Sequence, residues 1–308
     1  MTFKNYLKIS FANFDKTWKL IFYRIIVWAI VIGLIAPFYN VLKDIVVENW
    51  NASLMQDFVL AGLFYGNNIA VTFISVIDVL ISALTTLFTQ YLAVGIYISV
   101  ILFLVRPFFM NIGRYVVNEM MYGYMSSHAK HGFASTWVRT MKKSALYAFF
   151  RTLFCLPFNV LTAGIFYLLL TVNGSEFALA MPFVFLIIAT IILSVKQFLT
   201  MGWAPAMVVS GENVYNAFGI GIKAVARGSA RSLLFCIATY FAVILLALGL
   251  GVVSLIILVP IFNVVSSMFE IMNFFSCQGM RYYVDKDTVL SSKKLEEQDT
   301  ITKAKFLL

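Results

Sequence analysis

Long apolar runs separated by shorter polar segments dominate the chain. A bilayer core about 30 Å thick is crossed by about 20 apolar residues in a helix that rises about 1.5 Å per residue. Six runs reach this length, at residues 19–38, 84–105, 146–171, 178–200, 232–250 and 252–276. The pattern predicts an all-α protein, a polytopic membrane helix bundle with six transmembrane helices paired in three hairpins.

The second run has no clear beginning. Apolar character starts near Ile69, but a helix from there to Val105 would be about 55 Å long, too long for one crossing. Polar residues are spread through 69–83, which we interpret as an extension outside the membrane or as a tilted and kinked approach to it. A polar face that runs on into the apolar run, formed by Asp78, Ser82, Thr85 and Thr89, would also suit a hydrophilic path from outside.

Prolines mark expected helix ends and bends. Pro37, Pro107 and Pro205 follow the ends of apolar runs, where a residue without an N–H group stops a helix. Pro157 and Pro182 fall inside runs, where we expect kinks or an early turn.

A basic amphipathic stretch precedes each hairpin, at Phe3–Lys19, Gly132–Lys143 and Val214–Arg231. Each stretch has small and aromatic residues ahead of its basic ones. A helix of this kind lies in the membrane interface and is attracted by anionic lipid. We therefore expect three cytoplasmic interfacial helices, with the anionic lipids of the inner leaflet as partners.

Basic residues gather on one side of this topology. With the N-terminus inside, 22 of the 23 Lys and Arg residues fall in four inner segments: 1–24, 106–151, 196–231 and 270–308. Because cytoplasmic segments of membrane proteins are rich in Lys and Arg, both termini are expected in the cytoplasm. We predict an integral membrane domain over 1–284 and a charged cytoplasmic tail over 285–308.

The composition supports a membrane protein. Apolar residues make up 61% of the chain and charged residues 12%, with a mean hydropathy of +0.90 and a net charge of +9. Soluble proteins average about 45–50% apolar and about 25% charged residues. This balance argues against a soluble enzyme, a nucleic-acid-binding protein and a disordered protein. We expect a multi-pass protein of a bacterial cell membrane.

The third hairpin unit and the segment after the last run carry a family resemblance. Its residues are Ala217, Phe218, Lys223, Arg227, Arg231, Ser232–Gly249 and Met280–Asp285. With the three-hairpin plan, they resemble the six-helix membrane domain of bacterial glycerophosphodiester phosphodiesterases and related free-standing bacterial membrane proteins. The resemblance implies the same architecture. It implies no phosphodiesterase activity, because the chain has no segment large enough for that soluble domain.

Ionisable residues within apolar runs are the candidate functional residues. Arg24, Arg151 and Lys196 lie near the inner ends of their runs, where a long cation can reach the interface. Glu270 reaches less far, so it should pair with one of these cations or stay protonated. It also belongs to a polar stripe at helical spacing: Asn263, Ser266, Glu270 and Asn273. The stripe would form an interhelical hydrogen-bond seam or line a cavity open to the cytoplasm.

Signatures of catalysis are missing from the sequence. There is no GxxxxGK[ST], HExxH or GxSxG motif, and no pair of carboxylates within one membrane segment. His128 and His131 lack further ligands nearby, and three cysteines near the reducing side are read as small apolar residues. We therefore expect no catalytic residues, metal or cofactor.

Two functions fit these observations better than an intramembrane enzyme. The first is a non-catalytic scaffold or accessory subunit of a membrane complex, with a protein partner. The second is a permease for a small solute or lipid, with its polar path near Glu270.

Overall fold

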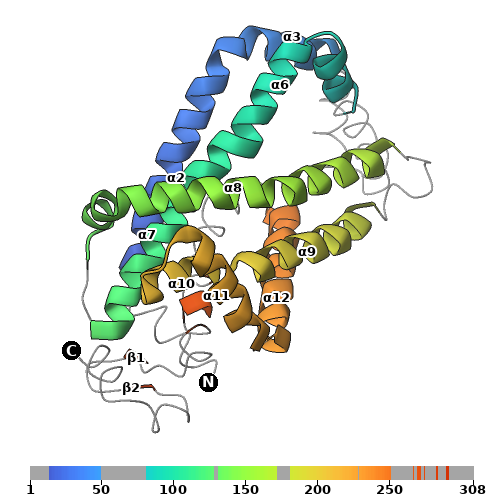
Figure 1. The fold of residues 1–308 in the computed structure, drawn as a ribbon. Helices are drawn as coiled ribbons and strands as arrows, with labels where there is room; N and C mark the ends of the chain where they lie inside the picture. The colour runs from blue at the N-terminus through green and yellow to red at the C-terminus, as the bar shows by residue number, and fades with distance from the viewer. Residues whose placement is uncertain are drawn as a thin grey trace. The chain divides into compact units, whose positions relative to one another are not determined.

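The computed structural model describes residues 14–49, 81–127, 131–171, 181–227 and 229–250, together with several positions between 266 and 290. These residues are almost entirely helical (Figure 1). Residues 81–89 are helical, and the other helices are α2 (Phe14–Ile35), α3 (Tyr39–Asn49), α6 (Leu92–Val100), α7 (Arg106–Ser127), α8 (Phe133–Thr171), α9 (Met181–Thr200), α10 (Trp203–Ser210), α11 (Val214–Arg227) and α12 (Ser229–Leu250). Strands β1 (Tyr282–Tyr283) and β2 (Val289–Leu290) form a short antiparallel pair.

Four stretches of helix are long and apolar enough to cross a membrane: Trp18–Ile45, Leu92–Tyr124, Phe133–Leu169 and Phe183–Ser210. They indicate an integral membrane protein. Of the other two expected spans, 232–250 forms α12, whose described apolar part at Ser232–Leu245 is shorter than a full crossing. Most of 252–276 lies outside the described residues.

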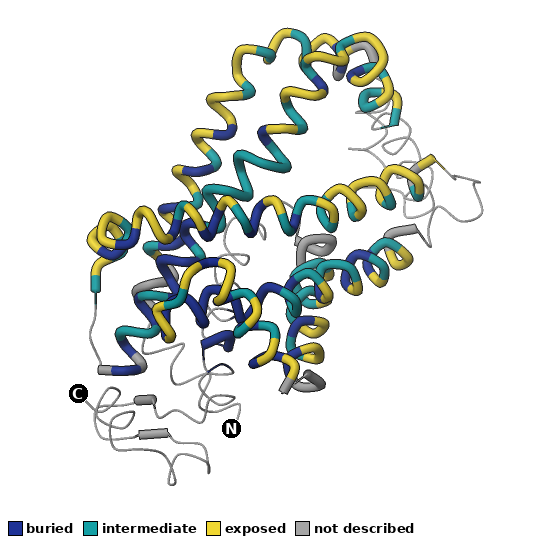
Figure 2. The backbone as a smooth tube through the Cα atoms, in the orientation of Figure 1, coloured by how far each residue is buried: buried dark blue, intermediate teal, exposed yellow. Residues whose placement is uncertain are grey.

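The outward faces of these helices are apolar. In α2, Leu20 and Val27 belong to a buried stripe, whereas Phe22 is 63% and Ile26 58% exposed. Exposed and buried positions alternate in the same way along α8 and α9 (Figure 2). A helix facing water would carry polar residues on its outer side, so these outer faces match a lipid environment.

The prediction that Pro107 follows a helix end is wrong. The helix breaks earlier, at residues 90–91, and then continues through α6 and α7 with a π-helical turn, η2 (Ile101–Val105), between them. Pro107 lacks an N–H group, and its ring would clash with the carbonyl one turn back in a regular α-helix. A π turn directly before it changes the local spacing, so the helix accommodates the proline instead of ending.

The first two basic stretches are not separate helices in the part of the chain described. α8 is one helix of 39 residues that joins the expected stretch 132–143 to the apolar run 146–171 and contains Pro157. α2 likewise continues from Phe14 through the first run. Only the third stretch forms a helix of its own, α11, because Gly211 with a φ of 70° separates it from α10 and α12 begins at Ser229.

The chain divides into two compact units. The first comprises 1–27, 107–155 and 190–308, and the second comprises 28–106 and 156–189. Large side chains fill the core of the first unit, including the fully buried Tyr115 and Tyr147. In the second unit, the guanidinium of Arg106 lies 4.4 Å from the ring centre of Trp28.

Helices α10 and α11 pack closely against each other in the first unit. A Cβ atom added to Gly202 would lie 2.8 Å from Cα of Gly221, so the two backbones touch directly. Trp203 Nε1 donates to the carbonyl of Val214, 2.8 Å away. Pro205 does not terminate a helix here, because it lies in the first turn of α10, where its missing N–H has no intrahelical partner. Trp203, at the start of α10, also contacts the ring of Tyr147 on α8.

Candidate functional site: a buried arginine and glutamate cluster

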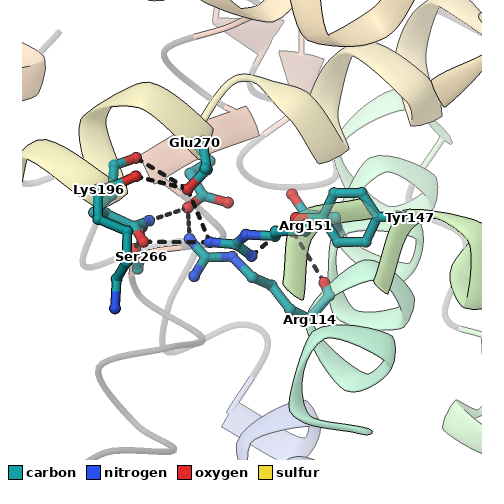
Figure 3. Close-up of polar contacts among 9 residues, drawn as sticks. Arg114, Tyr147, Arg151, Lys196, Ser266 and Glu270 are labelled. Atoms are coloured by element: carbon teal, nitrogen blue, oxygen red, sulfur yellow. Dashed lines mark hydrogen bonds and ion pairs between the residues drawn. The ribbon is translucent and has the colours of Figure 1, made fainter. Parts of the chain in front are cut away.

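The only carboxylate of the last apolar run is buried and ion-paired. Glu270 is 2% exposed, and its Oε1 atom accepts from Arg114 Nη2 on α7 (Figure 3). The same oxygen accepts a hydrogen bond from Gln197 Nε2 on α9. Gln197 also donates to Ser266 Oγ, 3.3 Å away and one helical turn before Glu270. Three segments far apart in the sequence therefore meet at one carboxylate.

A second buried arginine extends the cluster to α8. Arg151 is 3% exposed and donates to Tyr147 Oη at 2.9 Å, one helical turn earlier. Its Nη2 atom donates to Thr200 Oγ1 at 3.1 Å and to Gln197 Oε1 at 3.4 Å. Gln197 thus connects the two charged groups, because its amide nitrogen serves Glu270 and its amide oxygen serves Arg151.

Local sequence explains how each side chain reaches the cluster. Tyr147 and Arg151 are four residues apart on α8, and Gln197 and Thr200 are three apart on α9, so each pair shares a helix face. Thr200 lies at the end of α9, where its hydroxyl also bonds the carbonyl of Lys196 at 3.0 Å. Trp203 then packs on Tyr147 with ring centres 5.8 Å apart.

Not every polar atom of the cluster has a partner. The Nε atoms of Arg114 and Arg151 and the Oε2 atom of Glu270 are buried without a hydrogen bond to any described residue. A buried polar atom left unpaired costs about 1–3 kcal/mol, and more when the group is charged. The cluster therefore holds two guanidinium groups and one carboxylate, and each of these three groups has one polar atom without a hydrogen bond to a described residue.

The structure brings together three of the predicted site residues: Ser266, Glu270 and Arg151. Lys196 adjoins them through its carbonyl, and its side chain extends away from Glu270 (Figure 3). Arg24 lies half-buried on α2. Asn263 and Asn273 lie outside the described residues.

Two features of the cluster differ from the expectation. Arg151 is buried in the bundle rather than reaching outward to the interface, because neutral oxygens surround its guanidinium. The cation paired with Glu270 is Arg114, which lies in the inner segment 106–151 and was not among the expected partners Arg24, Arg151 and Lys196. Sequence reasoning did not single out Gln197, Thr200 or Tyr147. Thr200 and Tyr147 lie four positions from Lys196 and Arg151, which is a usable signal, whereas the only signal of Gln197 is a polar side chain within an apolar run.

The described residues bring together no three His, Cys, Asp or Glu side chains that could ligate a metal. Cys155 and Cys236 are buried free thiols. The arrangement can fix helices to one another and can hold charge inside an apolar bundle. The long apolar helices place the chain in the class of integral membrane proteins. Neither protein-family models, curated proteins nor solved structures match it.

Proposed function

We propose that the chain is a non-catalytic integral membrane protein that acts as a scaffold or accessory subunit of a membrane complex. The observation that supports this most directly is the use of the buried polar groups. Gln197 on α9 bonds both to Arg151 on α8 and to Glu270, as the polar residues of structural seams in membrane bundles do. Such a seam fixes the helices and leaves the outer faces for lipid and for a partner.

The first part of α8 supports contact with anionic lipid. Arg139, Lys142 and Lys143 are exposed there beside exposed apolar side chains, with Val138 72% and Met141 62% exposed. Cations next to apolar groups on one helix suit the headgroup region of a negatively charged leaflet. Together with the charge distribution in the sequence, this supports a position of the start of α8 and of both termini on the cytoplasmic side of the cell membrane. The proposed number of six spans is supported by the lengths of the apolar runs alone.

The test is purification of the tagged full chain from its native membrane in lipid-retaining particles, followed by mass spectrometry. A stoichiometric protein partner is the expected result. The matched control is the Arg114→Met/Glu270→Met double variant, which removes the pair and tests whether the seam is needed to present the binding surface. Particles that hold lipid or a small solute at a fixed ratio, and no protein partner, would contradict the scaffold proposal.

A second candidate is a permease for a small solute or lipid, and the imbalance of buried charge favours it. Charged side chains inside a bundle often mark transport paths. For this candidate we expect Glu270→Gln to change flux in proteoliposomes, with Glu119→Gln as a control outside the cluster. Unchanged flux of every solute carried by the wild type would remove its support.

A further inference from the structure

Arg106 carries a positive charge into an apolar part of the second unit. It directly follows the π turn η2, within the helix Leu92–Tyr124 that is apolar enough to cross a membrane. Its guanidinium lies against the ring of Trp28 on α2, 4.4 Å from the ring centre. No carboxylate of a described residue pairs with it. In the part of the chain that the structure describes, this charge therefore lacks a counter-charge.

One edge of this guanidinium is open. Arg106 is half-buried, and its Nε atom is enclosed without a hydrogen bond to a described residue. The terminal nitrogens Nη1 and Nη2 are neither enclosed in this way nor bonded to a described residue. Arg151 differs, because both of its terminal nitrogens already donate to neighbouring side chains. The edge formed by Nη1 and Nη2 of Arg106 is thus a free pair of donors.

Two local features hold the guanidinium at this place. The π turn adds one residue to the helix and so rotates the residues after it by about 100° relative to a regular α-helix. Arg106, the first residue after the turn, then contacts α2. The ring of Trp28 covers one side of the cation, and this cation–π contact restricts its position. Single π turns within helices are frequent at functional sites.

The helix face around Trp28 is the kind of surface that lipid covers. Ile25 and Ile32 lie three and four positions from Trp28, so they share its face, and they are 48% and 64% exposed. Trp28 lies about 14 Å along the helix from Lys19, where the first apolar run begins. A cation at such a depth is costly unless it reaches an anion or water, and the bilayer thins locally around it. Lipid phosphates are the anions that this thinning brings near.

We propose that Arg106 and Trp28 form a binding site for the phosphodiester of one membrane phospholipid. The Nη1 and Nη2 edge donates to two phosphate oxygens, the fork geometry in which arginine binds phosphate. The single negative charge of the phosphodiester balances Arg106, and the acyl chains lie along the apolar face near Ile32. Because Arg106 begins the inner segment 106–151, the lipid belongs to the cytoplasmic leaflet in the orientation proposed above. The site does not depend on the scaffold role.

The experiment is native mass spectrometry of the full chain, stripped of lipid in a maltoside detergent and titrated with one lipid at a time. The probes are dioleoylphosphatidylglycerol and dioleoylglycerol, the same lipid without its phosphate. Thermal unfolding with each lipid is compared with unfolding in inorganic phosphate and in sodium chloride of equal ionic strength. We expect the first phosphatidylglycerol to bind at least about 10-fold more tightly than dioleoylglycerol and to raise the Tm, and inorganic phosphate to have no effect beyond that of chloride.

Three variants locate the site. Arg106→Gln should weaken the first phosphatidylglycerol at least about 10-fold and leave dioleoylglycerol unchanged, a selective loss that a folding defect would not produce. Arg106→Lys keeps the charge but loses the fork and the flat contact with Trp28, so it should also bind the phospholipid more weakly than the wild type. Lys43→Gln, a change at an exposed cation of the same unit, should leave both lipids unaffected.

Equal affinity of the wild type and Arg106→Gln for phosphatidylglycerol would overturn the proposal. Equal affinity of the wild type for the two lipids would do so as well, because the phosphate would then contribute nothing. A rise in Tm with inorganic phosphate as large as that with the phospholipid would identify a site for a free anion and refute the lipid assignment. Each of these results is separate from the presence of a protein partner.

Discussion

The Glu270–Arg114 pair allows a quantitative test of the buried cluster. Glu270→Met leaves two guanidinium groups inside the bundle without a carboxylate. Removing one partner of a buried pair costs about 3–5 kcal/mol, which is about a 100- to 4,000-fold change in the unfolding equilibrium. The side chains are 1% and 11% exposed, so water can relieve little of this loss. The upper half of that range is therefore expected.

Removal of the arginine of this pair should destabilise the protein less than removal of the glutamate. In Arg114→Met, Glu270 still has Gln197 as a donor, and Arg151 already reaches Gln197 from the other side, so the remaining charges balance. We expect Arg114→Met to lower the unfolding free energy by at least about 2 kcal/mol less than Glu270→Met does. The double variant Arg114→Met/Glu270→Met has the same net charge as the wild type, so it should recover most of the stability lost in Glu270→Met.

The assay is equilibrium unfolding in mixed micelles of maltoside and dodecyl sulfate, in phosphate-free buffer, followed by tryptophan fluorescence and circular dichroism. The matched control is the Glu119–Arg139 pair, whose side chains are 20% and 56% exposed. Because water screens this pair, it should contribute only about 0–1 kcal/mol to the unfolding free energy. Equal losses for Glu270→Met and Arg114→Met would refute the charge-balance reasoning. Losses as small as those of the control would refute the burial argument.

Three further predictions concern packing and topology. Gly221→Ala should lower the unfolding free energy by about 1–3 kcal/mol, because its Cβ would lie 2.9 Å from the backbone nitrogen of Trp203, while Gly219→Ala, which faces open space, should raise it by about 0.5–1 kcal/mol. Trp203→Phe should cost about 1–3 kcal/mol in the same assay, because it removes the hydrogen bond to the Val214 carbonyl and leaves a small void in the core. In a cysteine-free background, an impermeant maleimide should label a cysteine at Lys43 in intact cells but one at Lys142 only after permeabilisation. Labelling of both from outside would contradict the orientation.

Sequence reasoning found part of the candidate site for a simple physical reason. A charged or polar residue in an apolar helix is rare enough to stand out, and Glu270, Ser266 and Arg151 were recognised in this way. Arg114 fell in the inner segment 106–151, outside the apolar runs, because the second run was expected to end at 105 with Pro107 just beyond it. None of the apolar, polar or proline patterns in the sequence predicts the π turn before Pro107, which lets the helix continue through the proline.

Pairing within the cluster was also beyond sequence reasoning. Arg114 and Glu270 are 156 positions apart, and Gln197 and Glu270 are 73 apart. Helical periodicity says which residues share a face of one helix, but it does not say which face of another helix lies opposite. Gln197 and Thr200 gain their importance only from that contact.

The sequence by itself determined the class of molecule, because the length and hydropathy of a run decide whether a helix can cross a bilayer. Four of the long apolar helices follow from this reasoning. Tertiary structure decided where those helices continue or break, that α10 is buried against α11, and which arginine neutralises Glu270. These outcomes depend on side chains that meet only in space, so the balance of charge inside the bundle became visible only once the helices were packed.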